Sequence, residues 1–426
     1  MIITVVGAGY VGLVSAAVLA KKHTVICVDK DKKKIAALRK GKVPFYEPGL
    51  PALLSDVVKR PKGLSFATDL PFALRMADAV FICVGTPSNP DGSANISAVL
   101  AVAKEIAVPL KVDGLVVIKS TVPPGTWSKV ASTILQTRPQ GKFMVVSNPE
   151  FLREGSAIND MEHPDRVVVG AEDDAAFEVM ARICRYNRVM RTWVEMDNTS
   201  AELTKYASNA FLAMKISYAN LLAEVCESTG GNVDKVTQAM GLDKRIGGSF
   251  LWAGIGYGGS CFGKDVAAFH RIDPGDLLLS SVQGINERAR SRVVGVVEAV
   301  LHGNAVVAVF GLAFKPNTDD IRDSPALHIA ERLVTYGYKV NAYDPAAMEN
   351  VRKLKIKGLK LCKDTYEAVK GASCLIIATE WREVYLLDFI RIKRLMKQPR
   401  IFDGRNMLDP SDMRKLGFIY QSIGRP

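Results

Sequence analysis

Short apolar runs alternate with helical patterns over the first part of the chain. Runs with the length and composition of buried strands occur at residues 2–6, 24–28, 79–84, 115–118, 143–146 and 167–169, and residues 13–21 have helical composition. Strands that are apolar on both faces and separated by helices are typical of a parallel sheet covered on both sides. The pattern therefore predicts an α/β domain over residues 1–196.

Near residue 198 the pattern changes to that of one long helix. Apolar side chains recur there at steps of three and four residues, and neither Gly nor Pro interrupts them before Gly230 and Gly231. Such a length suggests a spine between domains or a dimer contact. A further helical pattern covers 282–301, and a second α/β unit follows, with strands at 305–310, 339–343, 373–378 and 400–402 and a helix at 325–336. We therefore predict a helical middle at 197–300 and a second α/β domain at 301–426.

Composition places the 426-residue chain among ordinary globular proteins, because 48% of its residues are hydrophobic and 23% are charged. The net charge of +12 would suit an anionic ligand such as a nucleotide, and it would also suit nucleic acid. The densest basic runs, 30–42 and 391–400, do not interleave the aromatic residues that stack on bases. We therefore expect no nucleic-acid partner.

Cysteine and histidine usage bounds the compartment and the metal chemistry. The seven cysteines form no CxxC pair and several lie in apolar runs, which is typical of a reducing compartment without a zinc site, and the five histidines are scattered singly. Residues 1–20 are uncharged, but no basic residue precedes them and glycines interrupt them, so they do not resemble a signal peptide. No other stretch approaches the ~20 apolar residues of a membrane span. We expect a cytoplasmic protein with no membrane partner and no metal.

The string GAGYVG at 7–12 follows a strand, opens a helix and precedes a second strand that ends at Asp29. In a dinucleotide-binding fold, Gly7 allows the tight turn, Gly9 lets a pyrophosphate approach the backbone and Gly12 brings helix and strand together. The helix N-terminus offers N–H groups to the phosphates. Asp29 would bind ribose hydroxyls and repel a 2′-phosphate, which favours NAD, although Lys30 and Lys34 leave NADP open.

A glycine-rich segment, GIGYGGSCFGKD at 254–265, surrounds one cysteine. Five glycines in ten residues exclude a helix or a central strand and predict a loop whose backbone can approach a ligand. Cys261 therefore differs from the other six cysteines, which look buried, and Lys264 would favour its thiolate. From composition alone, a structural turn with an incidental cysteine is an equal alternative.

Two further pairs are ambiguous by themselves. Lys205 and Asn209 share a face of the long helix, where a desolvated Lys could stabilise an oxyanion, but by themselves they are better explained as an ordinary solvated face. Glu150 and Glu154 follow a strand, at the position where open α/β sheets place ligands.

Taken together, the motifs resemble those of the UDP-glucose/GDP-mannose dehydrogenases over nearly the whole chain and in order. The matching strings are GAGYVG, FYEPGL at 45–50, CVGTPS at 83–88, KSTVPPGT at 119–126, NPEFLREG at 148–155, the helix with Lys205 and Asn209, GYGGSCFGKD, GLAFKPNTDDIRDSP at 311–325 and FDGRN at 402–406. The resemblance implies two Rossmann-like doubly wound domains joined by a central long-helix region: an NAD-binding domain, a dimerisation region and a UDP-binding domain.

The resemblance also implies a two-step, NAD-dependent oxidation of a nucleotide sugar's C6 alcohol to a carboxylate. Cys261 would capture the aldehyde as a thiohemiacetal that becomes a thioester, Lys205 would stabilise the oxyanion, and Asn209 would hold the C6 oxygen. Asp265 with Thr121 would activate water, and Glu150 would act as acid/base.

By the same resemblance, the NAD site would comprise Gly7, Gly9, Tyr10, Val11, Gly12, Asp29, Lys34, Thr86, Thr121, Glu154, Lys264 and Arg322. The substrate site would comprise Glu150, Phe151, Leu152, Lys205, Asn209, Phe250, Leu251, Trp252, Gly254, Gly258, Lys315 and Arg405, with Arg245 reaching it from the partner of a homodimer. Trp252 departs from several relatives, which carry Lys or Asn there.

GYGGSCFGKD and FYEPGL favour UDP-glucose as the substrate, to be oxidised to UDP-glucuronate. The alternatives are GDP-mannose or a UDP-N-acetylhexosamine with the same chemistry, or a non-catalytic protein that binds nucleotides. Cys261, Lys205, Asn209 and Asp265 argue against the last, because a pure binder needs no thiol there. The long helix is expected to form a homodimer, which could assemble further.

Overall fold

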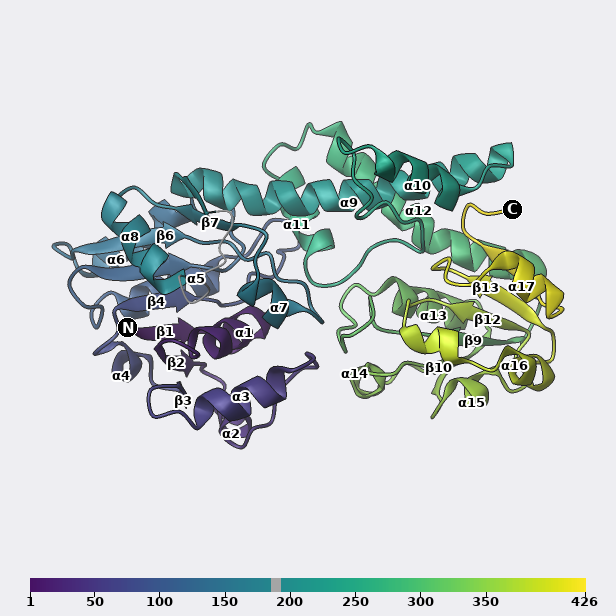
Figure 1. Ribbon diagram of the computed structural model, residues 1–426, viewed down its shortest axis with the longest axis horizontal. Helices are drawn as coiled ribbons and strands as arrows, with labels where there is room; N and C mark the ends of the chain where they lie inside the picture. Colours follow the sequence, from purple (N-terminus) through teal and green to yellow (C-terminus); the bar gives the residue numbers. More distant parts are fainter. Residues whose placement is uncertain (185–192) are drawn as a thin grey trace. The chain divides into compact units, whose positions relative to one another are not determined.

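The computed structural model describes residues 1–184 and 193–426. They form two compact units, Met1–Ser208 and Asn209–Pro426, and each contains one sheet with helices packed on it (Figure 1). The division falls inside helix α9 (Asn198–Thr229), so one helix contributes to both units. The fold class expected from the apolar pattern is confirmed, whereas the three-part division at residues 197 and 301 stays a prediction.

The sheet of the N-terminal unit has eight strands in the order β3-β2-β1-β4-β5-β6-β7-β8. Their bounds are β1 (Ile2–Val6), β2 (Thr24–Val28), β3 (Leu64–Ala67), β4 (Ala79–Ile82), β5 (Gly114–Ile118), β6 (Phe143–Ser147), β7 (Val167–Gly170) and β8 (Trp193–Met196). The first six strands pair in parallel. From β1 to β3 the chain adds strands toward one edge of the sheet, and from β4 to β6 it adds them toward the other edge, so the strand order switches between β1 and β4. Such a switch point opens a crevice at the carboxyl ends of the strands.

One part of the expected parallel sheet is wrong, because β7 runs antiparallel to β6, with Ser147 opposite Gly170. A parallel crossover usually needs a full helix to carry the chain back along the sheet. The connection between these strands contains only a six-residue helix, and β7 runs beside β6 in the opposite direction. The short strands β3 and β8 were not predicted from the apolar pattern.

Both faces of this sheet are buried, which explains why its strands are almost continuously apolar. Phe81 and Val117 contribute to one hydrophobic cluster and their neighbours Val80 and Val116 to the other. The first cluster is covered by α1 (Tyr10–Leu19), α2 (Lys32–Arg39), α3 (Leu50–Val58), α7 (Ala157–Glu162) and α8 (Asp174–Cys184). The second is covered by α4 (Leu70–Leu74), α5 (Ser97–Ile106) and α6 (Thr126–Thr137).

Helix α9 has the bounds that its periodicity predicted. Gly230 adopts a φ of +78°, and the N–H of Gly231 donates to the carbonyl of Cys226 at 2.8 Å, the pattern of a Schellman cap. The helices α10 (Val233–Leu242), α11 (Phe262–His270) and α12 (Leu277–Val300) follow, and the apolar sides of α9, α11 and α12 share one cluster. Helix α12 begins earlier than its expected start at residue 282.

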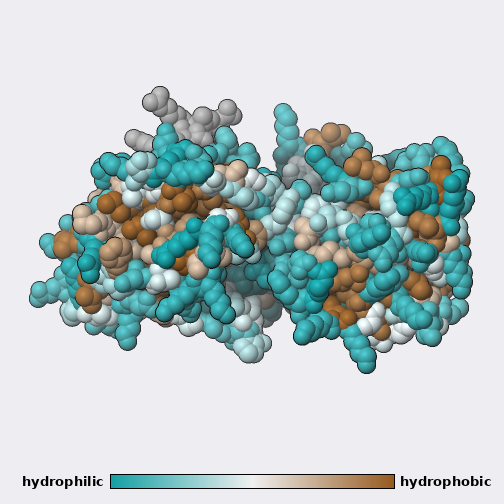
Figure 2. Space-filling model, turned by 90° about the horizontal axis from the view of Figure 1, so that it is seen from below, coloured by the Kyte–Doolittle hydropathy of each residue, from teal (hydrophilic) through white to brown (hydrophobic). Residues whose placement is uncertain are grey.

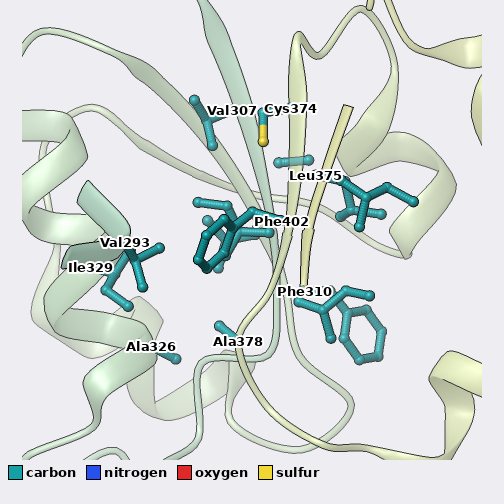
Figure 3. Close-up of a cluster of buried hydrophobic side chains, with 14 of the residues drawn as sticks. Val293, Val307, Phe310, Ala326, Ile329, Cys374, Leu375, Ala378 and Phe402 are labelled. Atoms are coloured by element: carbon teal, nitrogen blue, oxygen red, sulfur yellow. The ribbon is translucent and has the colours of Figure 1, made fainter. Parts of the chain in front are cut away.

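The second sheet has six parallel strands in the order β11-β10-β9-β12-β13-β14. Its elements are β9 (Val306–Phe310), α13 (Pro325–Thr335), β10 (Lys339–Tyr343), α14 (Met348–Leu354), β11 (Leu359–Leu361), α15 (Thr365–Val369), β12 (Cys374–Ile377), the 3-10 helix η1 (Arg382–Leu386), α16 (Phe389–Leu395), β13 (Arg400–Asp403), α17 (Pro410–Lys415) and β14 (Ile419–Ser422). Figure 3 shows Val293 of α12 and Ile329 of α13 packed with Phe402 in its core.

On the face shown in Figure 2 hydrophilic residues prevail, and hydrophobic residues gather in groups between them. Among the described residues, no helix combines the length and the apolar character that a membrane crossing requires. All seven cysteines are free thiols.

Candidate functional site

The glycines of GAGYVG form a tight cradle between β1 and α1. Gly7 has a φ of +103°, and a Cβ there would lie 2.7 Å from the carbonyl oxygen of Cys83. A Cβ on Gly12 would lie 1.8 Å from the carbonyl oxygen of Gly7, so helix and strand touch through this residue. Nothing lies within 4 Å of a Cβ on Gly9, whose backbone is open to a ligand. No side chain caps α1, so its first N–H groups are available to a pyrophosphate.

Asp29 follows β2 and is held in place by its neighbours. Its carboxylate accepts hydrogen bonds from the N–H groups of Ala8 and Asp31, each at 2.9 Å, and from Lys34 Nζ at 2.8 Å. Burial opposes ionisation, but these hydrogen bonds, that of Lys34 first, outweigh it and lower the pKa of Asp29. The ammonium of Lys34 pairs with this carboxylate. The carboxylate is the kind of group that accepts hydrogen bonds from the ribose hydroxyls of NAD.

Loops that leave neighbouring strands meet beside this cradle. Thr86 follows β4, and its hydroxyl donates to the backbone carbonyl of Thr121, which follows β5, at 2.7 Å. Glu154 is half-buried in the loop after β6. Glycines, Asp29 and loop residues thus fit a dinucleotide with one anionic pyrophosphate and free ribose hydroxyls.

Glu150 and Lys205, ambiguous in the sequence, form a buried ion pair in the N-terminal unit. Lys205 Nζ lies 3.1 Å from Glu150 Oε1, and the two side chains are only 5% and 6% exposed. The ring centroid of Phe151 lies 5.4 Å from the same ammonium and 3.7 Å from the guanidinium of Arg166. Because the side chain of Lys205 is buried, the interpretation of a solvated helix face is wrong. A desolvated ammonium also interacts strongly with charge that develops nearby.

Glu150, Phe151 and Leu152 also line a cavity of about 180 Å³ in the same unit. Lys119, which the sequence analysis did not single out, lines it too and donates to Asn148 Oδ1 at 3.0 Å. Burial lowers the pKa of Lys119. A single Lys inside KSTVPPGT carries no pattern that distinguishes it from a surface lysine.

In the C-terminal unit, Cys261 occupies the N-cap position of α11 and is partly exposed. Its Sγ lies 3.6 Å from Ser260 Oγ. The positive end of the helix favours a negatively charged sulfur. Five of the other cysteines are buried and Cys184 is half-buried, so the expectation of six buried cysteines holds for five. Burial raises the pKa of Cys83 and Cys374 to about 12, as expected for inert thiols.

The glycine-rich loop before α11 is closely packed. A Cβ on Gly256, Gly258 or Gly259 would lie within 2.7 Å of Asn286, Asp323 or Phe314, respectively. Asn286 also exchanges hydrogen bonds with both backbone polar groups of Tyr257 at 2.8 and 3.2 Å. Arg290, one turn further along α12, donates to the Tyr257 carbonyl at 2.6 Å and pairs with Asp323 at 2.7 Å. These supports were missed because nothing in the sequence links residues so far apart.

Asn209 and Asp265 meet in the same unit. Asn209 Nδ2 donates to Asp265 Oδ2 at 2.7 Å, and Lys264 Nζ lies 2.6 Å from Asp265 Oδ1. Asp265 is 1% exposed, and its N–H donates to the carbonyl of Cys261 at 2.8 Å. A buried carboxylate with a cation and an amide donor is therefore fixed one turn beyond the thiol.

The remaining predicted residues of this unit fall into an ordered group and an exposed group. Arg405 donates to the carbonyls of Ala378 and Gly256 at 2.9 and 3.3 Å, and a Cβ on Gly254 would lie 3.4 Å from its guanidinium. Leu251 is buried, Phe250 has a φ of +65°, and Lys315 and Arg322 lie in the 311–325 segment. Trp252 is 71% exposed, and Arg245, with a side chain 89% exposed, pairs with Asp243.

The second sheet repeats the strand order of the first but lacks a dinucleotide cradle. Asp344 ends β10 as Asp29 ends β2, yet it is fully buried. Its carboxylate accepts from the N–H groups of Leu312 and Ala313 and from Trp381 Nε1 at 2.7, 3.0 and 3.1 Å. Those internal bonds leave it unable to bind a ribose.

Among the described residues, no group of three or more His, Cys, Asp or Glu could hold a metal ion.

Three domain models of one protein family match successive regions of the chain. The NAD binding domain of the UDP-glucose/GDP-mannose dehydrogenase family matches residues 1–188, its central domain 199–288 and its UDP binding domain 308–410. The UDP-glucose 6-dehydrogenase of Rhizobium meliloti (strain 1021) is 47% identical over 438 residues, with all of both chains covered. That of Pseudomonas aeruginosa is 42% identical over 444 residues, which cover 100% of this chain and 98% of the relative.

Two solved structures match this chain over its full length. A UDP-glucose dehydrogenase from the archaeon Pyrobaculum islandicum matches with a TM-score of 0.91 at 37% identity, covering 100% of this chain and 98% of the other. A UDP-D-ManNAc dehydrogenase from Pyrococcus horikoshii matches with a TM-score of 0.88 at 27% identity, covering 100% and 99%.

Proposed function

Because this chain belongs to the UDP-glucose/GDP-mannose dehydrogenase family, we propose that it oxidises UDP-glucose to UDP-glucuronate. The family resemblance inferred from the motifs and NAD as the cofactor are confirmed by the matched domains. The observation that carries the proposed chemistry is the position of Cys261, at the head of α11 one turn before the buried Asp265. The choice of UDP-glucose is supported by the two curated relatives described above, both named UDP-glucose 6-dehydrogenase.

NAD, held by the GAGYVG cradle, Asp29, Lys34 and the loops with Thr86, Thr121 and Glu154, would supply the hydride acceptor for both oxidations. Lys264 and Arg322 are proposed as further contacts to it. The protein's own groups then do the remaining chemistry. Lys205, as a buried cation, stabilises the negative charge that develops on the C6 oxygen while Asn209 holds that oxygen.

Cys261 makes the second oxidation possible. Its sulfur adds to C6 of the aldehyde and the carbonyl oxygen takes up a proton, which gives a thiohemiacetal whose carbon carries a hydride to be removed. Loss of that hydride and of the hydroxyl proton leaves a thioester. Asp265, with Thr121, positions water for attack on the thioester, and release of the carboxylate returns the thiol. Glu150, paired with Lys205, serves as the acid/base.

Nucleotide-sugar binding is assigned to the loops around these groups. The proposed contacts are Phe151, Leu152, Phe250, Leu251, Trp252, Gly254, Gly258, Lys315 and Arg405, with Arg245 contributed by a partner subunit. A UDP-N-acetylhexosamine is the second candidate substrate, because a UDP-D-ManNAc dehydrogenase matches this fold over its full length.

The experiment is to follow NADH absorbance with NAD and a panel of UDP-glucose, GDP-mannose, UDP-N-acetylglucosamine and UDP-N-acetylmannosamine. We expect two NADH per UDP-glucuronate released and no free aldehyde. Cys261→Ala should lower acid formation about a thousandfold or more, whereas the matched thiol control Cys362→Ala, in the core of the second sheet, should stay within about twofold of wild type. Turnover of another nucleotide sugar but not of UDP-glucose would identify that sugar as the substrate instead. No turnover with any of the four would favour a nucleotide-binding protein without catalytic activity.

We also propose a homodimer formed through α9. Phe211, Tyr218 and Val225 are 58%, 46% and 49% exposed and stand seven residues apart, the spacing of a seam between paired helices. A second copy of the chain would cover this stripe with the same one. The free thiols support a reducing compartment, and we propose a cytoplasmic location.

A further inference from the structure

The family motif FYEPGL contributes a buried carboxylate to which the proposed mechanism assigns no role. Glu47 is 3% exposed and precedes α3. Its Oε2 accepts a hydrogen bond from the hydroxyl of Tyr10 and one from the N–H of Gly155 at 2.6 Å. Its Oε1 accepts one from the N–H of Ala157 at 2.8 Å. A carboxylate this buried is stable only where donors surround it.

These partners belong to two different parts of the proposed site. Tyr10 is the first residue of α1 and part of GAGYVG, where the cofactor's pyrophosphate would lie. Gly155 ends the segment 148–155, which carries Glu150, Phe151 and Leu152 of the substrate site. Glu47 therefore contacts both the cofactor cradle and the substrate segment at once.

The phenol of Tyr10 completes a closed triangle of hydrogen bonds. The N–H of Gly155 donates to Tyr10 Oη at 3.0 Å as well as to Glu47. Phe45, from the same motif, packs its ring 4.8 Å from the ring of Tyr10. Burial, and next the bond to Glu47, raise the pKa of Tyr10, so the phenol stays protonated and remains a donor. A shift of α1 by the bound cofactor would thus move the partners of Gly155.

We propose that Tyr10 and Glu47 are positioning residues that couple occupation of the cofactor site to binding of the nucleotide sugar. The inference rests on the proposed function for the identity of the two ligands. Because coupling between two sites is reciprocal, a bound cofactor should tighten sugar binding by the same factor by which a bound sugar tightens cofactor binding. Couplings of this kind usually amount to about 5- to 150-fold.

The test measures the dissociation constant of UDP-glucose by calorimetry with and without saturating NADH, which cannot accept a hydride and so prevents turnover. In wild type, NADH should tighten UDP-glucose binding at least about fivefold. Tyr10→Phe removes only the hydroxyl, and Glu47→Gln replaces one acceptor oxygen by an amide that faces a backbone N–H. Each should reduce the factor to below about twofold, and the double variant should lose no more than either single one.

Glu162→Gln is the control, because Glu162 lies on α7 just beyond Ala157 but pairs with Lys21 instead of Tyr10. It should keep the wild-type coupling factor. A ratio is compared in every case, so changes in either affinity alone cancel. Coupling that persists in Tyr10→Phe and Glu47→Gln, or that is absent from wild type, would overturn the inference. Intact coupling without turnover would refute the proposed function alone.

Discussion

Glu202 links α9 to the start of α6, and its burial makes a prediction about stability. Its two carboxylate oxygens accept hydrogen bonds from three consecutive backbone N–H groups, those of Gly125, Thr126 and Trp127 at 2.7, 3.2 and 2.8 Å. The side chain lies one turn before Lys205 on the helix and is 3% exposed. Burial outweighs these bonds and raises the pKa of Glu202 from 4.5 to about 7.

The direction of the effect follows from which state holds the proton. Between pH 4.5 and about 7, the folded protein keeps a proton that the unfolded chain has released. Glu202 therefore stabilises the fold most at low pH, and this contribution is lost as pH rises through about 7. Within the range from about pH 5.5 to about pH 8.5, the folded state holds this extra proton only up to about pH 7, which is about 1.5 pH units. At about 1.4 kcal/mol per pH unit, the free energy of unfolding changes by about 2 kcal/mol.

Glu202→Gln cannot titrate, and its single carbonyl oxygen cannot serve all three N–H groups, which costs about 1–3 kcal/mol at any pH. We expect the deficit of the variant to be about 2 kcal/mol larger near pH 5.5 than near pH 8.5. Urea unfolding of the full chain, followed by tryptophan fluorescence, measures both deficits, since Trp127 adjoins the site. Glu178→Gln, an exposed carboxylate on α8, is the control. Equal deficits at the two pH values would refute the reasoning.

Three further outcomes are expected. Cys261→Ser keeps the shape but forms an oxygen ester with a poor leaving group, so intact-mass spectrometry after incubation with UDP-glucose and NAD should show a covalent adduct; an unmodified mass with normal acid formation would contradict the covalent route. Gly12→Ala should lower the melting temperature, because its Cβ has no room, whereas Gly9→Ala should leave the stability of the apo protein within about 1 kcal/mol of wild type and weaken NAD binding about tenfold or more. Equal losses of stability and of NAD affinity in the two variants would argue against the cradle. Tyr218→Asp should shift sedimentation at micromolar concentration toward the monomer, while Tyr336→Asp, at a similarly exposed tyrosine that follows α13, should not. An unchanged Tyr218→Asp assembly would exclude the α9 seam.

Local signals in the chain were sufficient for the frame of the molecule. Glycine spacing and strand-helix alternation predicted the cradle and Asp29 because turn geometry and backbone approach depend on a few neighbouring residues. The uninterrupted periodicity between residues 198 and 229 predicted α9 to its last residue, and Gly230 and Gly231 cap it as expected. The cysteine loop was visible because five glycines cannot be mistaken for a regular element.

What only the tertiary structure decided is which polar groups meet and which are buried. Asp29 and Asp344 read alike in the sequence, each at the end of a strand, yet the side chain of Asp29 stays 11% exposed, whereas Asp344 is fully buried and bonded to two backbone N–H groups and Trp381. The Glu150–Lys205 pair joins residues from distant segments. β7 runs antiparallel to β6, although its apolar run reads like those of the parallel strands. Periodicity records only whether a residue faces the interior; the partner it finds there depends on how distant segments pack, which no local pattern contains.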